Sequence, residues 1–319
     1  MLKRGEIVGK ILLTGSHGQI GTELADALGA RYGADAIVVS DVKADYAGPY
    51  THEVLDVTDG HAVTNIVRKH DIKEVYHLAA ILSAAGEKHP DLLWRVNMDG
   101  LKNVLDVAKE NRLKVFVPSS IAAFGPSTPM DMTPQTTIQR PTTMYGISKV
   151  AGELLCDYYF KKYGVDTRGV RFPGIISHKA LPGGGTTDYA VHIYYEAIKS
   201  GRYTSYIDKG TMMDMLYMPD AIEGVLALME ADGNKLNNRN AYNITAMSFD
   251  PEQLAASIKK EIPEFTLDYA VDDVRQAIAN TWPNSLDDHV AREEWGWNPK
   301  FDIDAMTKDM LYNLKLKLK

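Results

Sequence analysis

Three glycines at three-residue spacing, Gly15, Gly18 and Gly21, stand between an apolar, strand-like stretch (7–14) and a segment of helical spacing (22–28). A strand that turns tightly into a helix presents backbone N–H groups and the positive end of the helix dipole at the turn. Glycine adopts positive φ and has no side chain, so a pyrophosphate can approach such a backbone closely. An ordinary glycine-rich turn has the same pattern, and the glycines alone leave both interpretations open.

A carboxylate further along decides between them. Residues 36–40 are apolar and β-branched, and they end at Asp41, 20 residues after Gly21. An acid at this place in a strand-turn-helix-strand unit can accept hydrogen bonds from the ribose hydroxyls of a dinucleotide. The same carboxylate repels a 2′-phosphate, so the pattern favours NAD over NADP.

Strand and helix patterns continue to alternate along the chain, which is typical of a parallel sheet. We predict an α/β protein with a Rossmann-type doubly wound parallel sheet and a smaller C-terminal α/β substrate-binding part. Residues 1–172 are expected to bind the dinucleotide, and residues 173–319 to be mainly substrate-binding and interleaved with the first sheet. The further predicted strands are 74–78, 114–118 and 165–172, and the further predicted helices are 60–70, 91–111 and 144–163.

The predicted helix 144–163 carries a pair of residues that can act in catalysis. Tyr145 and Lys149 are four residues apart, which places them on one face of a helix. The pKa of a phenol is about 10, so it acts as a base at neutral pH only if a nearby positive charge favours the phenolate. Lys149 is predicted to supply that charge. Ser119 and Ser120 precede the tyrosine by about 25 residues, at the end of a predicted strand.

Composition limits the partners. The net charge of −7 and the pI near 5.7 argue against nucleic acid and anionic membranes as partners. The single cysteine, Cys156, is expected to be a small buried side chain in a reducing compartment. We expect a cytoplasmic protein, or one of the mitochondrial matrix if a presequence was removed, because residues 1–4 fit the start of the first strand better than a signal peptide.

These motifs together resemble the extended short-chain dehydrogenase/reductase family over nearly the whole chain. The supporting segments are Thr14-Gly15-x-x-Gly18-x-x-Gly21, Asp56-Val57, His77-Leu78-Ala79-Ala80, Ser119-Ser120, Tyr145-Gly146-Ile147-Ser148-Lys149 and Trp295-Gly296-Trp297-Asn298-Pro299. The resemblance implies an NAD-dependent enzyme with Ser120, Tyr145 and Lys149 as catalytic residues. It implies a cofactor site made of Gly15, His17, Gly18, Gln19, Ile20, Gly21, Asp41, Asp56, Val57, Leu78, Ala79, Ala80, Asn97, Ser119, Tyr145, Lys149 and Pro173. Alternatively, Asp56 is a turn former, the serines cap a strand and His77 is a core histidine.

The substrate half argues against a sugar nucleotide. Family members that act on such substrates carry an Asn after the strand that follows the Tyr-Lys helix, and later an Arg that grips the diphosphate. This chain has Pro173-Gly174 at the first place and Met213 at the second. Without a basic partner, a diphosphate is poorly held.

Three other segments are similar to the family members that oxidise the β-hydroxyl of L-threonine: residues 81–87, 181–190 and 282–288. The similarity implies oxidation of L-threonine to 2-amino-3-oxobutanoate, without a metal, in threonine catabolism toward glycine. It also implies a homodimer formed by the helices at 91–111 and 144–163. The implied substrate-binding residues are Ser83, Ser120, Tyr145, Gly185, Thr186, Thr187 and Trp282, the last as a lid or as core.

Two alternatives stay open from the sequence. One is a nucleotide-sugar epimerase or dehydratase, against which the missing Asn and Arg count. The other is an NAD-binding regulator without turnover, against which the presence of Ser120, Tyr145 and Lys149 counts.

Overall fold

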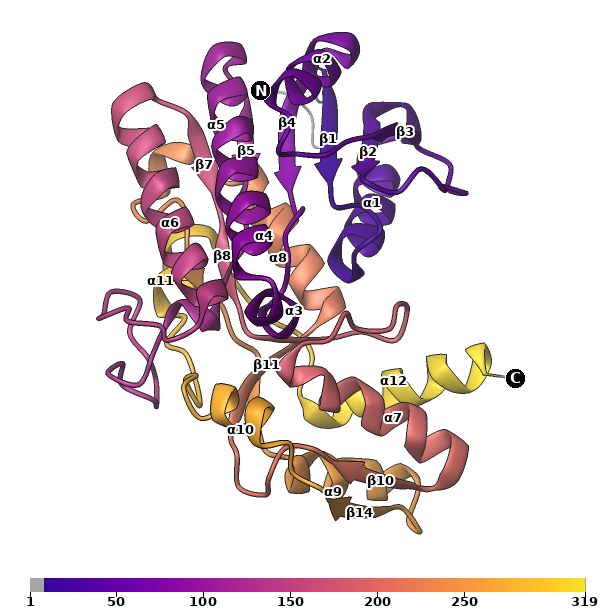
Figure 1. Ribbon diagram of the computed structural model, residues 1–319. Coiled ribbons are helices and arrows are strands. Elements are labelled where there is room, and N and C mark those ends of the chain that lie inside the picture. Colours follow the sequence, from indigo (N-terminus) through magenta and orange to yellow (C-terminus); the bar gives the residue numbers. More distant parts are fainter. Residues whose placement is uncertain (1–8, 319) are drawn as a thin grey trace.

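A computed structural model describes residues 9–318 and contains a six-stranded sheet at its centre, with strand order β3-β2-β1-β4-β5-β7 (Figure 1). Every neighbouring pair in this sheet is parallel. Parallel order with crossover helices is the Rossmann arrangement, so the predicted fold class is confirmed. The strands are β1 (Lys10–Thr14), β2 (Ile37–Asp41), β3 (Thr51–Val54), β4 (Ile72–His77), β5 (Lys114–Phe116) and β7 (Asp166–Arg168).

Helices cover both faces of the sheet because successive side chains of each buried strand point to opposite sides. In β1, Ile11 and Leu13 pack against the face covered by α1 (Gln19–Tyr32) and α8 (Met218–Glu230). Leu12 packs on the other face. That face is covered by α2 (Gly60–His70), α5 (Gly100–Asn111) and α6 (Met144–Tyr163).

The C-terminal part has a core of its own and also returns to the sheet. Helices α7 (Tyr189–Ser200), α9 (Pro251–Glu261) and α12 (Ile303–Lys317) share a second apolar cluster, which occupies the lower part of Figure 1. Helix α8 nevertheless packs beside α1 against the central sheet. Residues beyond 173 therefore build both a separate layer and one cover of the sheet, while the exact domain boundary at 172 stays a prediction.

The other elements complete the C-terminal part and the loops around the sheet. The remaining strands are β6 (Ser119–Ser120), β8 (Val170–Phe172), β9 (Gly174–Ile176), β10 (Arg202–Ser205), β11 (Met213–Tyr217), β12 (Tyr242–Asn243), β13 (Met247–Phe249) and β14 (Thr266–Tyr269). The remaining helices are α3 (Ser83–Lys88), α4 (Pro90–Trp94), α10 (Asp273–Ala279) and α11 (His289–Trp295), with short turns at Ala34–Ala36, Ile121–Ala123, Thr186–Asp188 and Gly233–Lys235.

Two predicted elements are interrupted. The predicted strand 165–172 divides into β7 and β8 at Gly169, where a Cβ would run into the carbonyl oxygen of Val117. The predicted helix 91–111 begins at Pro90 and contains a π-helical turn, Arg95–Asp99, between α4 and α5. Such insertions in a helix often occur near functional sites. The predicted start of the first strand, residues 7 and 8, lies outside the described residues.

The carboxyl ends of the strands determine where a ligand can bind. The glycine turn follows β1, Leu78 follows β4 and Ser119 follows β5, so these segments lie at one edge of the sheet. Within residues 9–318, no helix combines the length and apolar character needed to cross a membrane.

Candidate active site

The glycine turn between β1 and α1 lies against the end of β4. Gly15 has a φ of +70°, and a Cβ on it would lie 2.7 Å from the backbone nitrogen of Ala79. A Cβ on Gly21 would run into the backbone of Gly15. Within the described residues no side chain caps α1, so the N–H groups of its first turn, from Gln19 onward, can bind an anion. The turn has the shape and polarity that a pyrophosphate requires.

Asp41 ends β2 beside this turn, as the sequence predicts. Its Oδ2 accepts the backbone N–H of His17 at 3.1 Å, and its Oδ1 accepts that of Lys43 at 3.3 Å. The His17 ring lies beside Tyr46 and His52, with ring centroids 5.9 and 5.5 Å away. A carboxylate has about four acceptor sites, so Asp41 keeps capacity for ribose hydroxyls.

A cavity of about 1120 Å³, open mouth included, extends from the glycine turn across the ends of the strands. Predicted residues that line it are Gly15, Gly18, Gln19, Ile20, Gly21, Leu78, Ala80, Ser83, Ser119, Ser120, Tyr145, Lys149, Pro173, Gly185, Thr186, Thr187 and Trp282. The structure thus brings segments from both halves of the chain to one cavity.

Six predicted cofactor residues do not line this cavity: His17, Asp41, Asp56, Val57, Ala79 and Asn97. Asp56 forms a turn, since its Oδ1 accepts the backbone N–H and the hydroxyl of Thr58 at 2.9 and 2.8 Å. Asn97, in the π-helical turn, accepts the N–H of Ile81 at 2.8 Å and donates to its carbonyl at 3.1 Å. Asn97 therefore fixes the chain that leads into α3, and cofactor contacts by these residues stay predictions.

Tyr145 and Lys149 lie in the first two turns of α6, on the side that faces the cavity. Thr143 caps this helix by accepting the backbone N–H of Gly146 at 3.0 Å. The Nζ of Lys149 lies 5.3 Å from the centroid of the Tyr145 ring and donates to the carbonyl of Pro118 at 2.8 Å. The hydroxyl of Ser120 accepts the backbone N–H of Ala122 at 3.2 Å. The three predicted catalytic residues are thus assembled.

Burial affects the protonation of both side chains of this pair. Burial raises the pKa of Tyr145 to about 12, although a hydrogen bond with Ser120 acts in the opposite direction. Burial lowers the pKa of Lys149 to about 8, against the attraction of Glu153. Desolvation therefore penalises the charged forms of both side chains in the protein without its cofactor, and the expectation that Lys149 favours the phenolate stays a prediction.

The predicted substrate residues line the same cavity as the catalytic residues. Ser83 begins α3 and is buried, and Thr186 and Thr187 lie in a short turn after the glycine loop. The Oγ1 of Thr186 is buried and has no hydrogen-bond partner within residues 9–318. A buried hydroxyl without a partner is costly, so this one is available to a ligand. Trp282 lines the cavity and also packs in an apolar cluster with Tyr145, so it has features of both lid and core.

Sequence reasoning missed several lining residues, above all Asp188. Its Oδ2 accepts the N–H groups of Gly184 and Gly185 at 2.9 and 2.6 Å, which fixes the loop beside Thr186. Burial raises the pKa of this carboxyl. Its place directly after Thr186 and Thr187 was the available signal. The other missed lining residues are Leu82, Pro118, Ile121, Phe172, Gly174 and Ile175.

His77 and Cys156 are of residue types that often bind metals, but both are buried in the protein interior. His77 is a core histidine whose Nδ1 lies 3.0 Å from the hydroxyl of Thr14, and burial lowers its pKa to about 3. Cys156 is buried on α6, and burial raises the pKa of its thiol. The described part of the chain contains no group of three or more His, Cys, Asp or Glu side chains that could hold a metal ion.

Comparisons with known proteins show the family of this chain. Residues 11–245 match the NAD dependent epimerase/dehydratase family. A relative from Staphylococcus aureus strain USA300, described as an uncharacterized epimerase/dehydratase, is 55% identical over 97% of both chains.

Two solved structures are also similar over most of the chain. The X-ray structure of L-threonine dehydrogenase from Clostridium difficile has a TM-score of 0.96 and 54% identity, covering 98% of this chain and 99% of that one. A monomeric L-threonine 3-dehydrogenase from a metagenome has a TM-score of 0.94 and 49% identity, covering 97% and 100%. The resemblance inferred from the sequence motifs is confirmed.

The cofactor follows from the fit and the family together. The cradle formed by Gly15 and Gly21, the free helix N-terminus and the acid at the end of β2 suit NAD, which the family uses. The chain therefore belongs to the NAD dependent epimerase/dehydratase family.

Proposed function

We propose that this enzyme oxidises the β-hydroxyl of L-threonine with NAD, giving 2-amino-3-oxobutanoate. The observation that carries the proposal is one cavity that is lined by Ser120, Tyr145 and Lys149 together with Thr186 and Asp188. The solved threonine dehydrogenases that this chain resembles support the choice of substrate.

Each catalytic side chain has a distinct task. Tyr145 takes the proton of the substrate hydroxyl through its Oη, and Ser120 donates a hydrogen bond to the same substrate oxygen as it becomes a carbonyl. Lys149 favours the phenolate form of Tyr145 by its charge and is held in place by the carbonyl of Pro118. NAD, when bound, supplies the acceptor for the hydride that leaves the β-carbon.

Burial of Tyr145 does not by itself make the phenol a base, because burial raises its pKa. The protein by itself holds the phenol protonated at neutral pH, since its pKa is about 12. Lys149, with a pKa of about 8, is largely protonated there and stabilises any phenolate that forms. A phenolate at neutral pH therefore requires more stabilisation than Lys149 supplies in the protein without its cofactor.

A small zwitterion suits the opposite wall. Lys149 is the only basic side chain among the described lining residues, and it lies beside Tyr145, which leaves the diphosphate of a nucleotide sugar without a basic partner. We assign the substrate carboxylate to the hydroxyls of Ser83 and Thr186. The ammonium group is assigned to Asp188. The Oδ2 of this carboxylate accepts the N–H groups of Gly184 and Gly185, so we assign the contact to Oδ1.

A homodimer is part of the proposal. Large apolar side chains are exposed on α4 and α6, among them Trp94 at 42% and Leu154 at 62% exposure. Burying such a patch between two copies is favourable. Light scattering at several protein concentrations tests this, and a monomer throughout would contradict it.

The function is tested by NADH formation in a panel of L-threonine, D-threonine, allo-threonine, serine and UDP-sugars. L-Threonine should react fastest, and serine should be poorer because it lacks the methyl group, a difference of about 1–3 kcal/mol. Micromolar binding of a UDP-sugar without NADH formation from L-threonine would overturn the assignment.

A further inference from the structure

A buried network lies beneath the catalytic residues and shares their helix. Glu153 follows Lys149 by one helical turn on α6 and is only 7% exposed. Its Oε2 accepts Nη2 of Arg171 at 2.9 Å and Nε2 of Gln139 at 2.8 Å. Its Oε1 accepts Nε of Arg171 at 3.0 Å and the hydroxyl of Ser119. The carboxylate is thus fully engaged by three separate segments.

Arg171 is as deeply buried as Glu153, and its guanidinium group makes hydrogen bonds to several partners. It lies on β8, is 6% exposed, and donates from Nη1 to the carbonyl of Gln135 at 2.9 Å and to Oδ1 of Asn243 at 3.0 Å. Two-point pairing of Arg with a carboxylate fixes relative orientation as well as distance. The pair therefore locks α6 to β8.

Helix α6 binds two consecutive residues of the segment that leads to Ser120, namely Pro118 and Ser119. Lys149 donates to the carbonyl of Pro118 at 2.8 Å, and Glu153 accepts the hydroxyl of Ser119. Ser120 comes next in the chain and lines the cavity beside Tyr145. A shift of Ser119 would displace Ser120, because the two are adjacent in β6.

We propose that Glu153 is a positioning residue of the catalytic centre, holding Ser119 so that Ser120 faces Tyr145 and setting the charge balance around Lys149. The proposal rests on the function proposed above. It goes beyond it because Glu153 touches neither the substrate nor the cofactor in that scheme.

The charge of Glu153 also affects the pKa of Lys149. Burial lowers the pKa of Lys149, and Glu153 opposes this as the main attractive charge. The other titratable groups around Lys149 and Glu153 are Tyr145, Cys156 and Asp157 on α6, Arg171 on β8 and His77 on β4. Replacing Glu153 by Gln should therefore let Lys149 lose its proton at lower pH.

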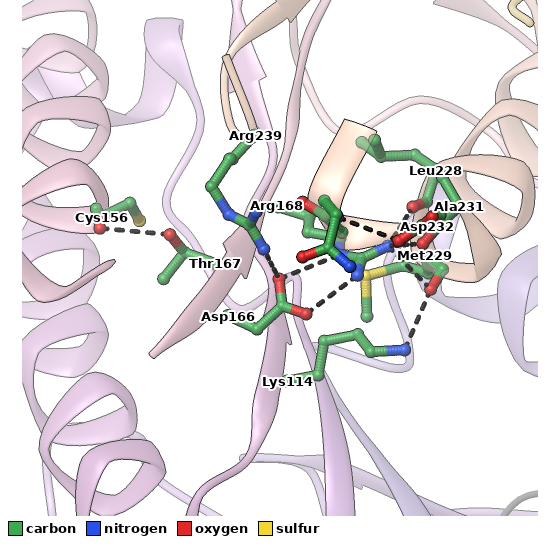
Figure 2. Close-up of polar contacts among 12 residues, drawn as sticks. Lys114, Cys156, Asp166, Thr167, Arg168, Leu228, Met229, Ala231, Asp232 and Arg239 are labelled. Atoms are coloured by element: carbon green, nitrogen blue, oxygen red, sulfur yellow. Dashed lines mark hydrogen bonds and ion pairs between the residues drawn. The ribbon is translucent and has the colours of Figure 1, made fainter. Parts of the chain in front are cut away.

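A second arginine network in the chain provides a matched control (Figure 2). Asp166 binds Arg168 at two points, 2.9 Å each, and accepts Nη2 of Arg239 at 2.7 Å. Arg168 also donates to the carbonyls of Leu228, Met229 and Ala231 at the end of α8. Asp166 begins β7, at the end of the sheet opposite the cavity. Asp166→Asn thus removes an Arg-paired carboxylate away from the site.

The experiment follows the Lys149 resonance in protein labelled with 13C at the lysine Cε, assigned by its loss in Lys149→Met, from pH 6 to pH 10 (roughly the range in which it titrates). Glu153→Gln should lower the titration midpoint by about 1 pH unit. Glu153→Asp, which keeps the charge, should restore it, and Asp166→Asn should leave it unchanged.

Kinetics test the positioning part. Glu153→Gln should lower kcat with L-threonine by about 10- to 100-fold, with a smaller change in KM, because misplacement affects the reacting geometry. The kcat/KM–pH profile should also move to lower pH. Ser119→Ala should lower kcat but leave the Lys149 midpoint in place, whereas Asp166→Asn should change thermal stability alone.

The outcomes separate the proposals. An unchanged Lys149 midpoint and an unchanged pH profile in a folded Glu153→Gln variant would overturn the positioning role. If that variant does not fold, the double variant Glu153→Gln/Arg171→Gln leaves no buried unpaired charge. Its kcat then tests the positioning part, because the two removed charges largely cancel at Lys149, and a kcat equal to that of the wild type would overturn that part. If the wild type does not oxidise L-threonine, the proposed function fails, while the resonance still reports on Glu153.

Discussion

Replacing Gly15 by alanine should cost stability and weaken NAD binding together, for two separable reasons. Gly15 has a φ of +70°, and an L-residue in the left-handed region costs about 1–2 kcal/mol. The new Cβ would also lie 2.7 Å from the Ala79 nitrogen and 2.8 Å from the carbonyl carbon of Leu78. Backbone cannot swing aside as a flexible side chain can, so overpacking should add about 1–3 kcal/mol. The expected total is about 2–5 kcal/mol.

Gly201 offers a matched control, because its φ is +69° and no described atom lies within 4 Å of a Cβ built on it. Gly201→Ala should cost only the conformational part, about 1–2 kcal/mol. Urea unfolding measures both free energies, and calorimetry measures NAD affinity, which should fall at least about tenfold in Gly15→Ala alone. Equal losses of stability in the two variants, with equal NAD affinity, would refute the close-approach reasoning.

Three further substitutions test the site. Tyr145→Phe should lower turnover by about 10²–10⁴-fold with the fold and NAD affinity preserved, since it deletes only the hydroxyl; near-normal turnover would remove Tyr145 from the mechanism. Asp41→Ala should narrow the ratio of kcat/KM for NAD over NADP, and an unchanged ratio would place the discriminating acid elsewhere. Thr186→Ala should raise KM for L-threonine more than it lowers kcat, because its proposed contact is to a group that does not react. A fall in kcat alone would contradict that contact.

Local signals account for the parts of the fold that the sequence predicts best. The predicted bounds 60–70 and 144–163 coincide with α2 and α6. Asp59 caps α2 by accepting the N–H groups of His61 and Ala62, and Gly164 ends α6 in the left-handed conformation. Caps are properties of neighbouring residues, so they are visible in one sequence.

Distant contacts account for the failures. The division of the predicted strand at Gly169 depends on the close approach of Val117, and the π-helical turn brings Asn97 to Ile81. Neither partner is a sequence neighbour. The raised pKa of Tyr145 likewise depends on burial by the C-terminal half, which a Tyr-x-x-x-Lys motif does not contain. The motif predicts which side chains meet, but the surrounding protein decides their protonation.

Helix α6 shows why the network around Glu153 is difficult to find from the sequence. Tyr145, Lys149 and Glu153 follow one another at four-residue spacing, so they form a single stripe along the helix. A stripe with two charged residues is normally expected on the solvent side, yet this one faces β6 and β8. Its burial is tolerated because Glu153 is paired with Arg171 and Lys149 with a carbonyl. The face of α6 that carries the chemistry is therefore also the face that anchors the helix, so a substitution at Glu153 should affect catalysis and stability together.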